Sequence, residues 1–343
     1  MKHILCICLS STIQRTVSFK TFTKKEVNRS LSYVEHASGK AINSARVLNQ
    51  LEKGCVTAIC PLGVQNADYF LNLAKNDELE LSYVLIPGNT RICWTLLDKS
   101  DSSTTELVVG EKEITEDDER TAPDEALPVE AAEIKLLKFI HEALDSADAV
   151  LLSGSRPKIW SNDLYAAIAG MAKDKGKLFL ADYIGDDLKL TLKSVTPDII
   201  KINDDEFIQT FMGDYNSDDK DAGKNKSSAG EKNVHNTAEQ KSSDGKNVSA
   251  DELKDAVIEL SRKLNNIVVV TRGTESTFGA DKGKFEECPI IKVNPVNTTA
   301  CGDSFNSGFL YEYLKSGDFS LALKKGTWCA AKNAESGIPG SIE

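Results

Sequence analysis

Short apolar runs alternate with helix-like patterns along most of the chain. The runs are rich in Ile, Val and Leu, which predicts buried strands, and they fall at residues 4–9, 56–60, 149–153, 178–181, 199–202 and 267–271. Between them, apolar positions recur at helical spacing, for example over residues 42–51, 134–144 and 164–173. This order predicts an α/β fold with a mainly parallel sheet and helices on both faces.

Three regions depart from that order. Polar and apolar residues alternate over 16–33 and 91–109, which predicts half-exposed strands. Residues 216–247 contain no Leu, Ile, Met, Phe, Tyr or Trp and are crowded with Lys, Asp, Ser, Asn and Gly. Such a segment cannot bury enough apolar surface to order itself, so we predict a disordered insertion over about residues 214–250.

Composition and charge narrow the classes of protein that fit. The 343 residues are 41% hydrophobic, which is ample for a substantial core. The net charge of −11 argues against a chain that coats nucleic acid or anionic membranes. No run approaches the roughly twenty apolar residues of a transmembrane helix. We therefore expect small molecules, and neither nucleic acid nor membrane, as partners.

The cysteines and residues 1–9 indicate the cellular compartment in which the protein is found. The eight cysteines include no Cys-x-x-Cys pair, and several fall in predicted strands, so they are typical of reduced core thiols. Residues 1–9 carry a single basic residue and no small-residue cleavage site, which favours a first strand over a signal peptide. We predict a cytoplasmic protein.

Residues 296–305 combine small side chains at a turn with an acidic residue, and an amphipathic pattern follows. The apolar residues on one face predict a helix that begins near Gly302; they are Phe305, Phe309, Leu310, Tyr313 and Leu314. The unpaired N–H groups of a first helical turn favour anions. A carboxylate at Asp303 can take a proton from an attacking hydroxyl during phosphoryl transfer. An ordinary capping aspartate is the alternative.

The run Asn-Thr-Thr-Ala-Cys-Gly-Asp-Ser-Phe around Asp303 resembles the C-terminal signature of the ribokinase-like PfkB carbohydrate kinases. That family's pattern ends in Gly-Ala-Gly-Asp, and Ala300 replaces its first glycine. The resemblance implies that Asp303 is the catalytic base. It also implies that Ala300, Cys301 and Gly302 supply the amides of an anion hole.

The same resemblance implies the architecture. Members of the family have a ribokinase-like three-layer α/β/α domain with a mainly parallel central sheet and a small β-sheet lid over the sugar site. Residues 1–343 would then form a single kinase domain. Its lid would come from about residues 13–35 and 90–109, the stretches that overlap the alternating patterns.

A second motif surrounds Lys40, where small residues precede an apolar helix. It resembles the family's Gly-Gly-Lys-Gly-Ile-Asn-Val-Ala-Arg-Val-Leu run, although Ser38 and Ala41 replace glycines. The resemblance implies that Gly39, Lys40 and Asn43 bind substrate. Taken alone, the local signal is weak.

Lys40 together with Arg91 resembles the branch of the family that phosphorylates sugar phosphates, namely 1-phosphofructokinase, tagatose-6-phosphate kinase and the minor 6-phosphofructokinase. Arg91 would clamp the phosphate already on the substrate, because a guanidinium group can bond two phosphate oxygens at once. Arg29, in the predicted lid, is our second candidate clamp. The local alternative for Arg91 is a surface strand arginine.

Two further positions bear on the sugar. Gln14 stands where the family usually has a sugar-binding aspartate. An amide can donate to and accept from hydroxyls but carries no charge, so the identity of the sugar stays open. Ser155 lies in a Ser-Gly-Ser-Arg-Pro run that resembles a family turn in which a serine faces the substrate, although such a run alone indicates only a turn.

The resemblance also assigns nucleotide and metal contacts. The run Lys-Ile-Asn-Asp-Asp-Glu resembles the family's Lys-Pro-Asn-x-x-Glu element, which implies that Asn203 meets nucleotide and that Glu206 acts on Mg²⁺ through water. An exposed first-turn glutamate is the local alternative. Thr271 and Gly273 match a strand and turn that meet nucleotide. Asn333 matches an asparagine beside the adenine.

These observations together predict an ATP- and Mg²⁺-dependent kinase for a sugar phosphate, most similar to 1-phosphofructokinase or tagatose-6-phosphate kinase. The family also allows a monovalent cation and a homodimer formed through the lid. Two alternatives stay open: a kinase for an unphosphorylated sugar or nucleoside, and a non-catalytic sugar-phosphate sensor. A nicotinamide dehydrogenase is disfavoured because no Gly-x-Gly-x-x-Gly follows the first strand.

Overall fold

The structure is a computed structural model that describes residues 1–110, 113–213 and 248–343. The insertion predicted over about 214–250 lies almost wholly outside these residues. All eight cysteines lie within them and are free, and seven are buried, as expected of reduced core thiols. Within the described ranges, no helix has both the length and the apolar character that crossing a membrane requires.

A nine-stranded sheet forms the centre of the molecule, in the order β13-β12-β11-β10-β9-β8-β1-β4-β5. Neighbouring strands from β11 to β5 run parallel, and β12 and β13 extend the sheet as antiparallel edge strands. The strands are β1 (Ile4–Ile7), β4 (Val56–Gly63), β5 (Glu80–Ile86), β8 (Ala149–Ser153), β9 (Leu178–Asp182), β10 (Ile199–Asn203), β11 (Ile267–Arg272), β12 (Glu275–Asp281) and β13 (Lys284–Cys288). The predicted mainly parallel sheet is therefore confirmed.

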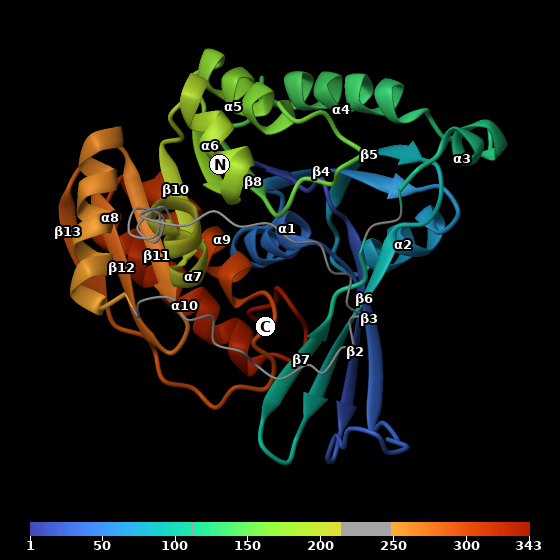
Figure 1. Ribbon diagram of the computed structural model, residues 1–343, viewed down its shortest axis with the longest axis horizontal. Helices are drawn as coiled ribbons and strands as arrows, with labels where there is room; N and C mark the ends of the chain where they lie inside the picture. The colour runs from blue at the N-terminus through green and yellow to red at the C-terminus, as the bar shows by residue number, and fades with distance from the viewer. Residues whose placement is uncertain (111–112, 214–247) are drawn as a thin grey trace, which may run out of the picture.

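Helices cover both faces of this sheet, because alternate residues of its strands point to opposite sides. In β1, Ile4 and Cys6 join the core beneath one helical layer, while Leu5 and Ile7 join the core beneath the other. The first layer contains α1 (Lys40–Leu51), α2 (Ala67–Lys75), α9 (Cys301–Ser316) and α10 (Phe319–Glu335). The second contains α4 (Val129–Ala143), α5 (Leu164–Asp174) and α6 (Gly185–Ser194). Figure 1 shows these layers.

Shorter elements complete the main body. Helix α8 (Ala250–Leu264) packs with α7 (Asp204–Phe207) against β10, β11 and β12 around a third, smaller core. A single π-helical turn (Ile208–Met212) follows α7, and α3 (Glu116–Thr121) precedes α4. The helix predicted to begin near Gly302 is α9, which begins one residue earlier, and its Phe305, Phe309 and Leu310 side chains are buried.

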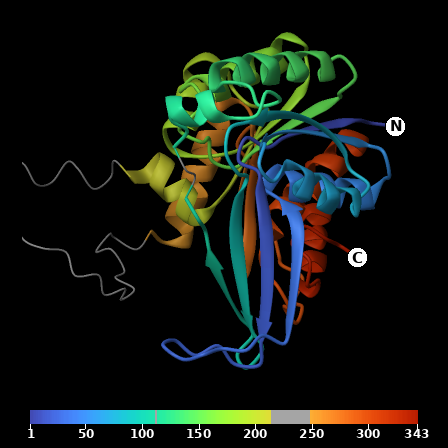
Figure 2. The same ribbon diagram turned by 90° about the vertical axis from the view of Figure 1, so that its right-hand side faces the viewer.

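A separate four-stranded sheet has the order β3-β2-β6-β7. Its strands are β2 (Thr12–Phe19), β3 (Ser32–Ser38), β6 (Arg91–Asp98) and β7 (Ser103–Leu107). Figures 1 and 2 show this small sheet extending away from the layered body, with the β2–β3 loop at its far end. The segments predicted to be exposed strands therefore do pair with one another, as a sheet of their own.

The predicted half-exposure of these strands is wrong for β2. All of its residues except Arg15 are buried. The strand lies between β3 and β6, and its polar side chains approach the loop that precedes α9, so their exposure is removed by tertiary contacts that alternation does not encode. Strand β3 matches the expectation better, since Tyr33 and Val34 are exposed.

Candidate active site

Asp303 lies in the first turn of α9 and is only 6% exposed. Asn43 Nδ2, in α1, donates a hydrogen bond to Asp303 Oδ2 at 2.9 Å. The hydroxyls of Ser44 and Ser307 donate to the backbone oxygen of Asp303 at 3.1 and 2.8 Å. These bonds join α1 to α9 and fix the position of the carboxylate.

The electrostatic surroundings of Asp303 favour a base that works near neutral pH. Burial raises the pKa of Asp303 to about 6, because a desolvated carboxylate is less stable in its ionised form. Lys40 opposes that rise in pKa and Asp182 adds to it, while the Asn43 hydrogen bond and Lys201 lower the pKa of Asp303. The carboxyl group is therefore mostly ionised at pH 7 and still basic enough to accept a proton.

Lys40 begins α1 and reaches into a group of carboxylates. Its Nζ lies 4.0 Å from Asp182 Oδ2 and 3.8 Å from Glu206 Oε1. The pKa of Lys40 is raised, chiefly by Asp182, and also by Asp303 and Glu206. Asp182 ends β9, and its Oδ2 accepts hydrogen bonds from Ser153 Oγ at 2.5 Å and Asn306 Nδ2 at 2.9 Å. The Lys40 ammonium group thus interacts electrostatically with three carboxylates. The structure brings together four predicted site residues, Lys40, Asn43, Glu206 and Asp303.

The turn before α9 has the geometry of an anion site. Ala300 adopts a left-handed backbone, with φ of 66°, and begins the helix without a side-chain cap. A Cβ added at Gly302 would lie 3.0 Å from Lys201 Nζ, so this buried lysine lies against the first helical turn. Of the first-turn amides, Cys301 N donates to Thr298 O at 3.3 Å. The N-terminus of a helix beside an ammonium group favours a phosphate. Cys301, the next residue of the turn after Ala300, is half-buried.

Asp182 and Lys201 had no predicted role. Each is a charged residue at the C-terminal part of an apolar strand, β9 or β10, and both are buried. Ligands of parallel α/β sheets bind at that edge. A buried charge at the end of a predicted strand is the sequence signal that identifies such residues.

Asn333, in α10, is fully buried. Its Nδ2 donates to Thr299 O at 2.8 Å and to Cys301 Sγ at 3.3 Å. Its Oδ1 accepts from Ser304 Oγ at 3.1 Å and from Gly340 N at 2.6 Å. Full burial leaves no surface for an adenine ring, so the predicted nucleotide contact does not fit. The amide instead holds the turn before α9.

The small sheet contacts the same turn. Gln14 Nε2 donates to Thr95 Oγ1 at 2.8 Å, and Thr95 Oγ1 lies 3.4 Å from Thr299 Oγ1. Thr299 Oγ1 in turn donates to Glu106 Oε1 at 2.7 Å. Strands β2, β6 and β7 are therefore connected to the residue that precedes Ala300, and Gln14 is joined to that residue through Thr95.

Arg91 and Lys40 have different partners in the structure. Arg91 Nε, at the start of β6, donates to Thr12 Oγ1 at 2.8 Å, whereas the ion pairs of Lys40 are with carboxylates. Arg91 borders a small cavity of about 90 Å³ together with Ser10 and Ser11. Ser11 Oγ is buried there without a hydrogen-bond partner, so this cavity has polar groups to offer a ligand.

The other predicted substrate residues are spread more widely. Gly39 has φ of 122°, and a Cβ there would lie 2.6 Å from Cys8 Sγ, so only glycine fits. Ser155 is exposed and follows Gly154, where an added Cβ would lie 3.8 Å from Lys40 Cβ. Arg29 is exposed in the β2–β3 loop at the far end of the small sheet.

The predicted nucleotide residues lie on adjacent strands. Thr271 is the register partner of Asn203, and Gly273, with φ of 57°, forms the exposed turn that follows. Asn203 and Glu206 form a capping box, in which Asn203 N donates to Glu206 Oε2 at 2.9 Å and Glu206 N donates to Asn203 Oδ1 at 2.8 Å. Only Oε1 of Glu206 faces Lys40.

The carboxylate oxygens at this edge of the sheet are suited to contact Mg²⁺ through water molecules. Asp182 and Glu206 offer carboxylate oxygens, which suit a hard cation. Among the residues that the structure describes, no group of three or more acidic, His or Cys side chains is arranged to hold a metal. The carboxylate of Glu206 would act on Mg²⁺ through water.

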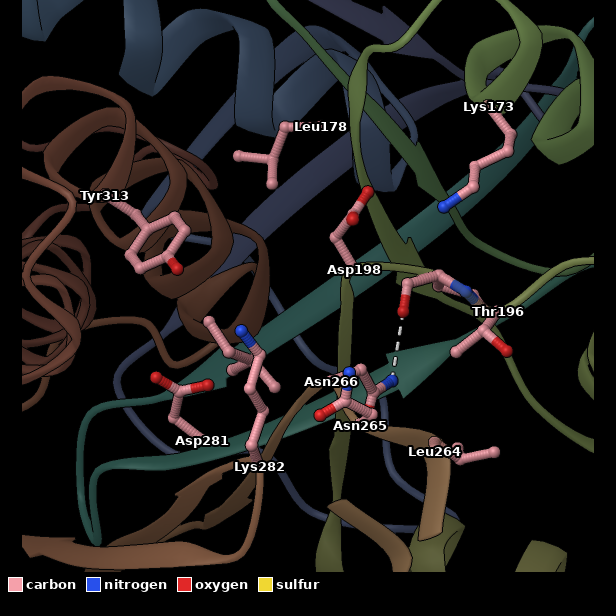
Figure 3. Close-up of a pocket in the computed structure, with 12 residues that line it drawn as sticks. Lys173, Leu178, Thr196, Asp198, Leu264, Asn265, Asn266, Asp281, Lys282 and Tyr313 are labelled. Carbon is pink, nitrogen blue, oxygen red and sulfur yellow. Dashed lines mark hydrogen bonds between the residues drawn. The ribbon is translucent and has the colours of Figure 1, made fainter. Parts of the chain in front are cut away.

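A larger cavity, of about 340 Å³, lies at the opposite edge of the sheet, where β9, β10 and β11 begin (Figure 3). Its charged lining residues are Lys173, Asp198, Asp281 and Lys282. Figure 3 shows Asp281 and Lys282 on the Tyr313 side and Lys173 beyond Asp198. No predicted site residue lines this cavity, so size alone does not identify the functional site.

A family model and curated proteins match nearly the whole chain. The family model described as "pfkB family carbohydrate kinase" matches residues 3–341. Among curated proteins, the tagatose-6-phosphate kinase of Staphylococcus epidermidis strain RP62A is 26% identical over 332 residues, covering 96% of this chain and 92% of the relative. The match therefore extends over nearly the full length of both proteins.

Solved structures show the same fold. Phosphofructokinase-2 from Escherichia coli in complex with fructose-6-phosphate superposes with a TM-score of 0.73 at 16% identity, covering 97% of this chain and 94% of that one. Ribokinase from Thermotoga maritima gives a TM-score of 0.64 at 17% identity, covering 100% and 96%. The predicted ribokinase-like fold is confirmed.

Proposed function

The chain belongs to the pfkB family of carbohydrate kinases, and from that premise we propose that it transfers the γ-phosphoryl group of ATP to a hydroxyl of a sugar phosphate. The favoured substrate class is a ketohexose phosphate, as for 1-phosphofructokinase or tagatose-6-phosphate kinase. Two relatives support that class: a curated tagatose-6-phosphate kinase, and a phosphofructokinase-2 of the same fold that was solved with fructose-6-phosphate.

The observation that carries the proposal is the buried Asp303 carboxylate beside the anion site of α9. In the proposed reaction Asp303 accepts the proton of the substrate hydroxyl while that oxygen attacks the γ-phosphorus in line with the leaving ADP oxygen. The pKa of about 6 suits this role, because the base is ionised at neutral pH, and the substrate hydroxyl becomes more acidic as its oxygen bonds to phosphorus.

Charge on the transferred group would be balanced by groups that are already in place. The backbone amides of Ala300, Cys301 and Gly302 and the ammonium groups of Lys40 and Lys201 surround the first turn of α9. Glu206 would hold Mg²⁺ through water, and the ion would supply positive charge that neutralises part of the charge on the nucleotide phosphates. Thr271, Gly273 and Asn203 are the proposed nucleotide contacts, and a monovalent cation remains part of the proposal.

Substrate would bind between the small sheet and α1. Arg91 is the proposed clamp for its phosphate, and Gln14 and Ser155 are proposed to contact the sugar. The small sheet would act as a lid that excludes water and limits ATP hydrolysis. We also propose a cytoplasmic location and a homodimer formed through that sheet, whose exposed apolar side chains include Leu31, Tyr33, Val34 and Leu107.

The test is ADP release with Mg²⁺ and ATP across fructose 1-phosphate, fructose 6-phosphate, tagatose 6-phosphate, free fructose, ribose and adenosine. We expect turnover with a phosphorylated hexose and its loss in Asp303→Asn. Asp281→Asn, at the opposite edge of the sheet, is the matched control and should keep its activity. Turnover with free sugars or nucleosides alone would overturn the substrate class, and binding of sugar phosphate without turnover would indicate a sensor.

A further inference from the structure

The side-chain amide of Asn43 is held from both of its ends. Its Nδ2 donates to Asp303 Oδ2 at 2.9 Å. Its Oδ1 accepts from Ser38 Oγ at 2.8 Å and from Arg46 Nη1 at 3.4 Å. Ser38, Asn43 and Arg46 are 3%, 4% and 2% exposed, so the whole chain of bonds is shielded from water.

The sense of these hydrogen bonds follows from the chemistry of the outer groups. An ionised carboxylate only accepts hydrogen bonds, and a guanidinium group only donates them. The amide nitrogen of Asn43 must therefore face Asp303 and its oxygen must face Arg46. The Ser38 hydroxyl can act in either way, and beside the amide oxygen it donates.

Of the two donors to Asn43 Oδ1, Ser38 is the stronger. Its bond is shorter by 0.6 Å, from 3.4 to 2.8 Å, and hydrogen bonds weaken with length. Arg46 Nη1 also makes a 2.7 Å bond to Pro339 O, and Arg46 Nη2 pairs with Asp77 at 2.8 Å. The guanidinium group is thus held chiefly by other partners. The Ser38 hydroxyl, by contrast, has Asn43 as its recorded partner among the described residues.

We propose that Ser38 is a positioning residue for Asp303 and that it acts through Asn43. By holding the amide oxygen, its hydroxyl keeps the amide N–H on the carboxylate that receives the substrate proton. In the resembling kinase motif this position is a glycine, which has no hydroxyl to offer, so the device is a property of this chain. Its catalytic meaning rests on the proposed function of Asp303 as the base.

The inference has a defined consequence for proton affinity. A donated hydrogen bond stabilises the ionised form of a carboxylate and lowers its pKa, and the Asn43 bond does so for Asp303. Without the Ser38 hydroxyl the amide oxygen keeps only the longer, 3.4 Å bond from Arg46, so the amide is held less firmly and the donated bond to Asp303 is weakened. The pKa of Asp303 should then rise, so that the group becomes ionised only at higher pH.

The first test measures this protonation directly, without turnover. Protein labelled with ¹³C at the aspartate carboxyl carbons is titrated by NMR, and the Asp303 signal is identified by its loss in Asp303→Asn. We expect Ser38→Ala to move the titration midpoint of that signal to higher pH. Ser18→Ala is the matched control, since Ser18 is also a buried serine of the small sheet and its hydroxyl bonds none of these residues. An unchanged midpoint in Ser38→Ala would overturn the inference.

The second test follows the acid limb of kcat/KM against pH. Ser38→Ala should lower kcat/KM about three- to tenfold near pH 5.5, and the loss should shrink to within about twofold near pH 8.5. In an Asn43→Ala background the added Ser38→Ala change should have no effect on the limb. A loss that is equal at all pH values, or that persists without Asn43, would show a purely structural role. Ser38→Gly, which restores the motif residue, is the second variant and should behave as Ser38→Ala does.

The two tests separate this inference from the proposed function. If Asp303→Asn keeps its turnover, Asp303 is not the base, whatever the NMR titration shows. If Asp303→Asn is inactive and the titration midpoint of Ser38→Ala does not move, the base assignment stands and the role of Ser38 fails.

Discussion

The Lys40 ammonium lies 4.0 Å from the Asp182 carboxylate, across the junction between α1 and the end of β9. This ion pair places Lys40 in the cluster around Asp303, where it lowers the pKa of Asp303. The resemblance implies a different role for Lys40, that of binding the substrate phosphate together with Arg91. The two roles of Lys40 lead to different kinetic predictions. In the cluster around Asp303 it would act on the transferred phosphoryl group, whereas beside Arg91 it would act on the phosphate already on the substrate.

We predict that Lys40→Met lowers kcat by about a hundredfold, because one preorganised positive charge is lost from the transition state. The acid limb of kcat/KM should also move to higher pH, since Lys40 no longer lowers the pKa of Asp303. Steady-state kinetics against pH measure both effects. Lys53→Met, an exposed lysine at the end of α1, is the control. A raised KM for sugar phosphate with unchanged kcat would instead show that Lys40 binds the phosphate already on the substrate.

Arg91→Met should produce the complementary pattern. Loss of a charge-assisted contact to the substrate phosphate should raise KM for the sugar phosphate by roughly a hundredfold, or about 3 kcal/mol, with a smaller change in kcat. The measurement is the ratio of kcat/KM for a sugar phosphate to that for its free sugar, which should fall in the variant. Arg120→Met, on the exposed helix α3, should leave the ratio unchanged. An equal loss with both substrates would show that Arg91 acts on the fold or on ATP.

The stability of the protein should depend on the ionisation of Asp303. Its pKa is raised from 3.8 in its unfolded reference to about 6, so the folded state binds this proton more tightly. The contribution to stability is fully present below about pH 3.8 and is lost as pH rises through 6. At pH 7.5 the ionised group should cost about 3 kcal/mol, from 1.36 kcal/mol for each unit of pKa.

Asp303→Asn should therefore be more stable than the native chain at pH 7.5, and the difference should shrink as the pH is lowered towards 4.5. Denaturant unfolding at several pH values measures this difference. Asp182→Asn is a useful comparison, because Asp182 also accepts two buried hydrogen bonds and its replacement leaves Lys40 with fewer partners. A variant of Asp303 that is less stable at every pH would contradict the raised pKa.

Local patterns were sufficient for most of the parallel strands and for several helices of the main body. The strand at residues 149–153 and the helix at 164–173 were predictable because their periodicity reflects which side faces the core. The burial of β2 was not predictable, because Gln14 and Thr16 are polar and become buried only through contacts with distant segments. Alternation records the residue types along a strand but not what later packs on either face.

The position of Asp303 in the first turn of a helix was predictable, because one short run contains both the turn and the helix. Asp303 follows from the turn and helix that surround it, whereas its neighbours Asp182 and Lys201 come from other strands and are brought near only by the order of the parallel sheet. The resemblance implies that Asn333 lies beside the adenine, but it does not give the direction of the Asn333 side chain. That direction is set by the packing of α10 on α9, which no local pattern contains.

Asn333 gives the last prediction, because its amide holds the turn that begins α9. Asn333→Ala removes the donor to Thr299 O and leaves the buried Gly340 N–H without its acceptor. Each such loss costs about 1–3 kcal/mol, so the free energy of unfolding should fall by about 2–4 kcal/mol. In the fraction that stays folded, kcat should fall more than KM for ATP rises, since the anion-hole amides lose their support.

Asn49→Ala is the matched control for Asn333→Ala, because the Asn49 amide also bonds backbone groups, those of Gly54 and Asp77, and neither of these belongs to α9 or to the turn before it. It should lower stability and leave kcat unchanged. Chemical denaturation and steady-state kinetics with ATP as the varied substrate separate the two effects. If Asn333→Ala raises KM for ATP and leaves kcat intact, the asparagine contacts nucleotide after all, and α10 must then move far enough from α9 to expose a side chain that is now completely enclosed.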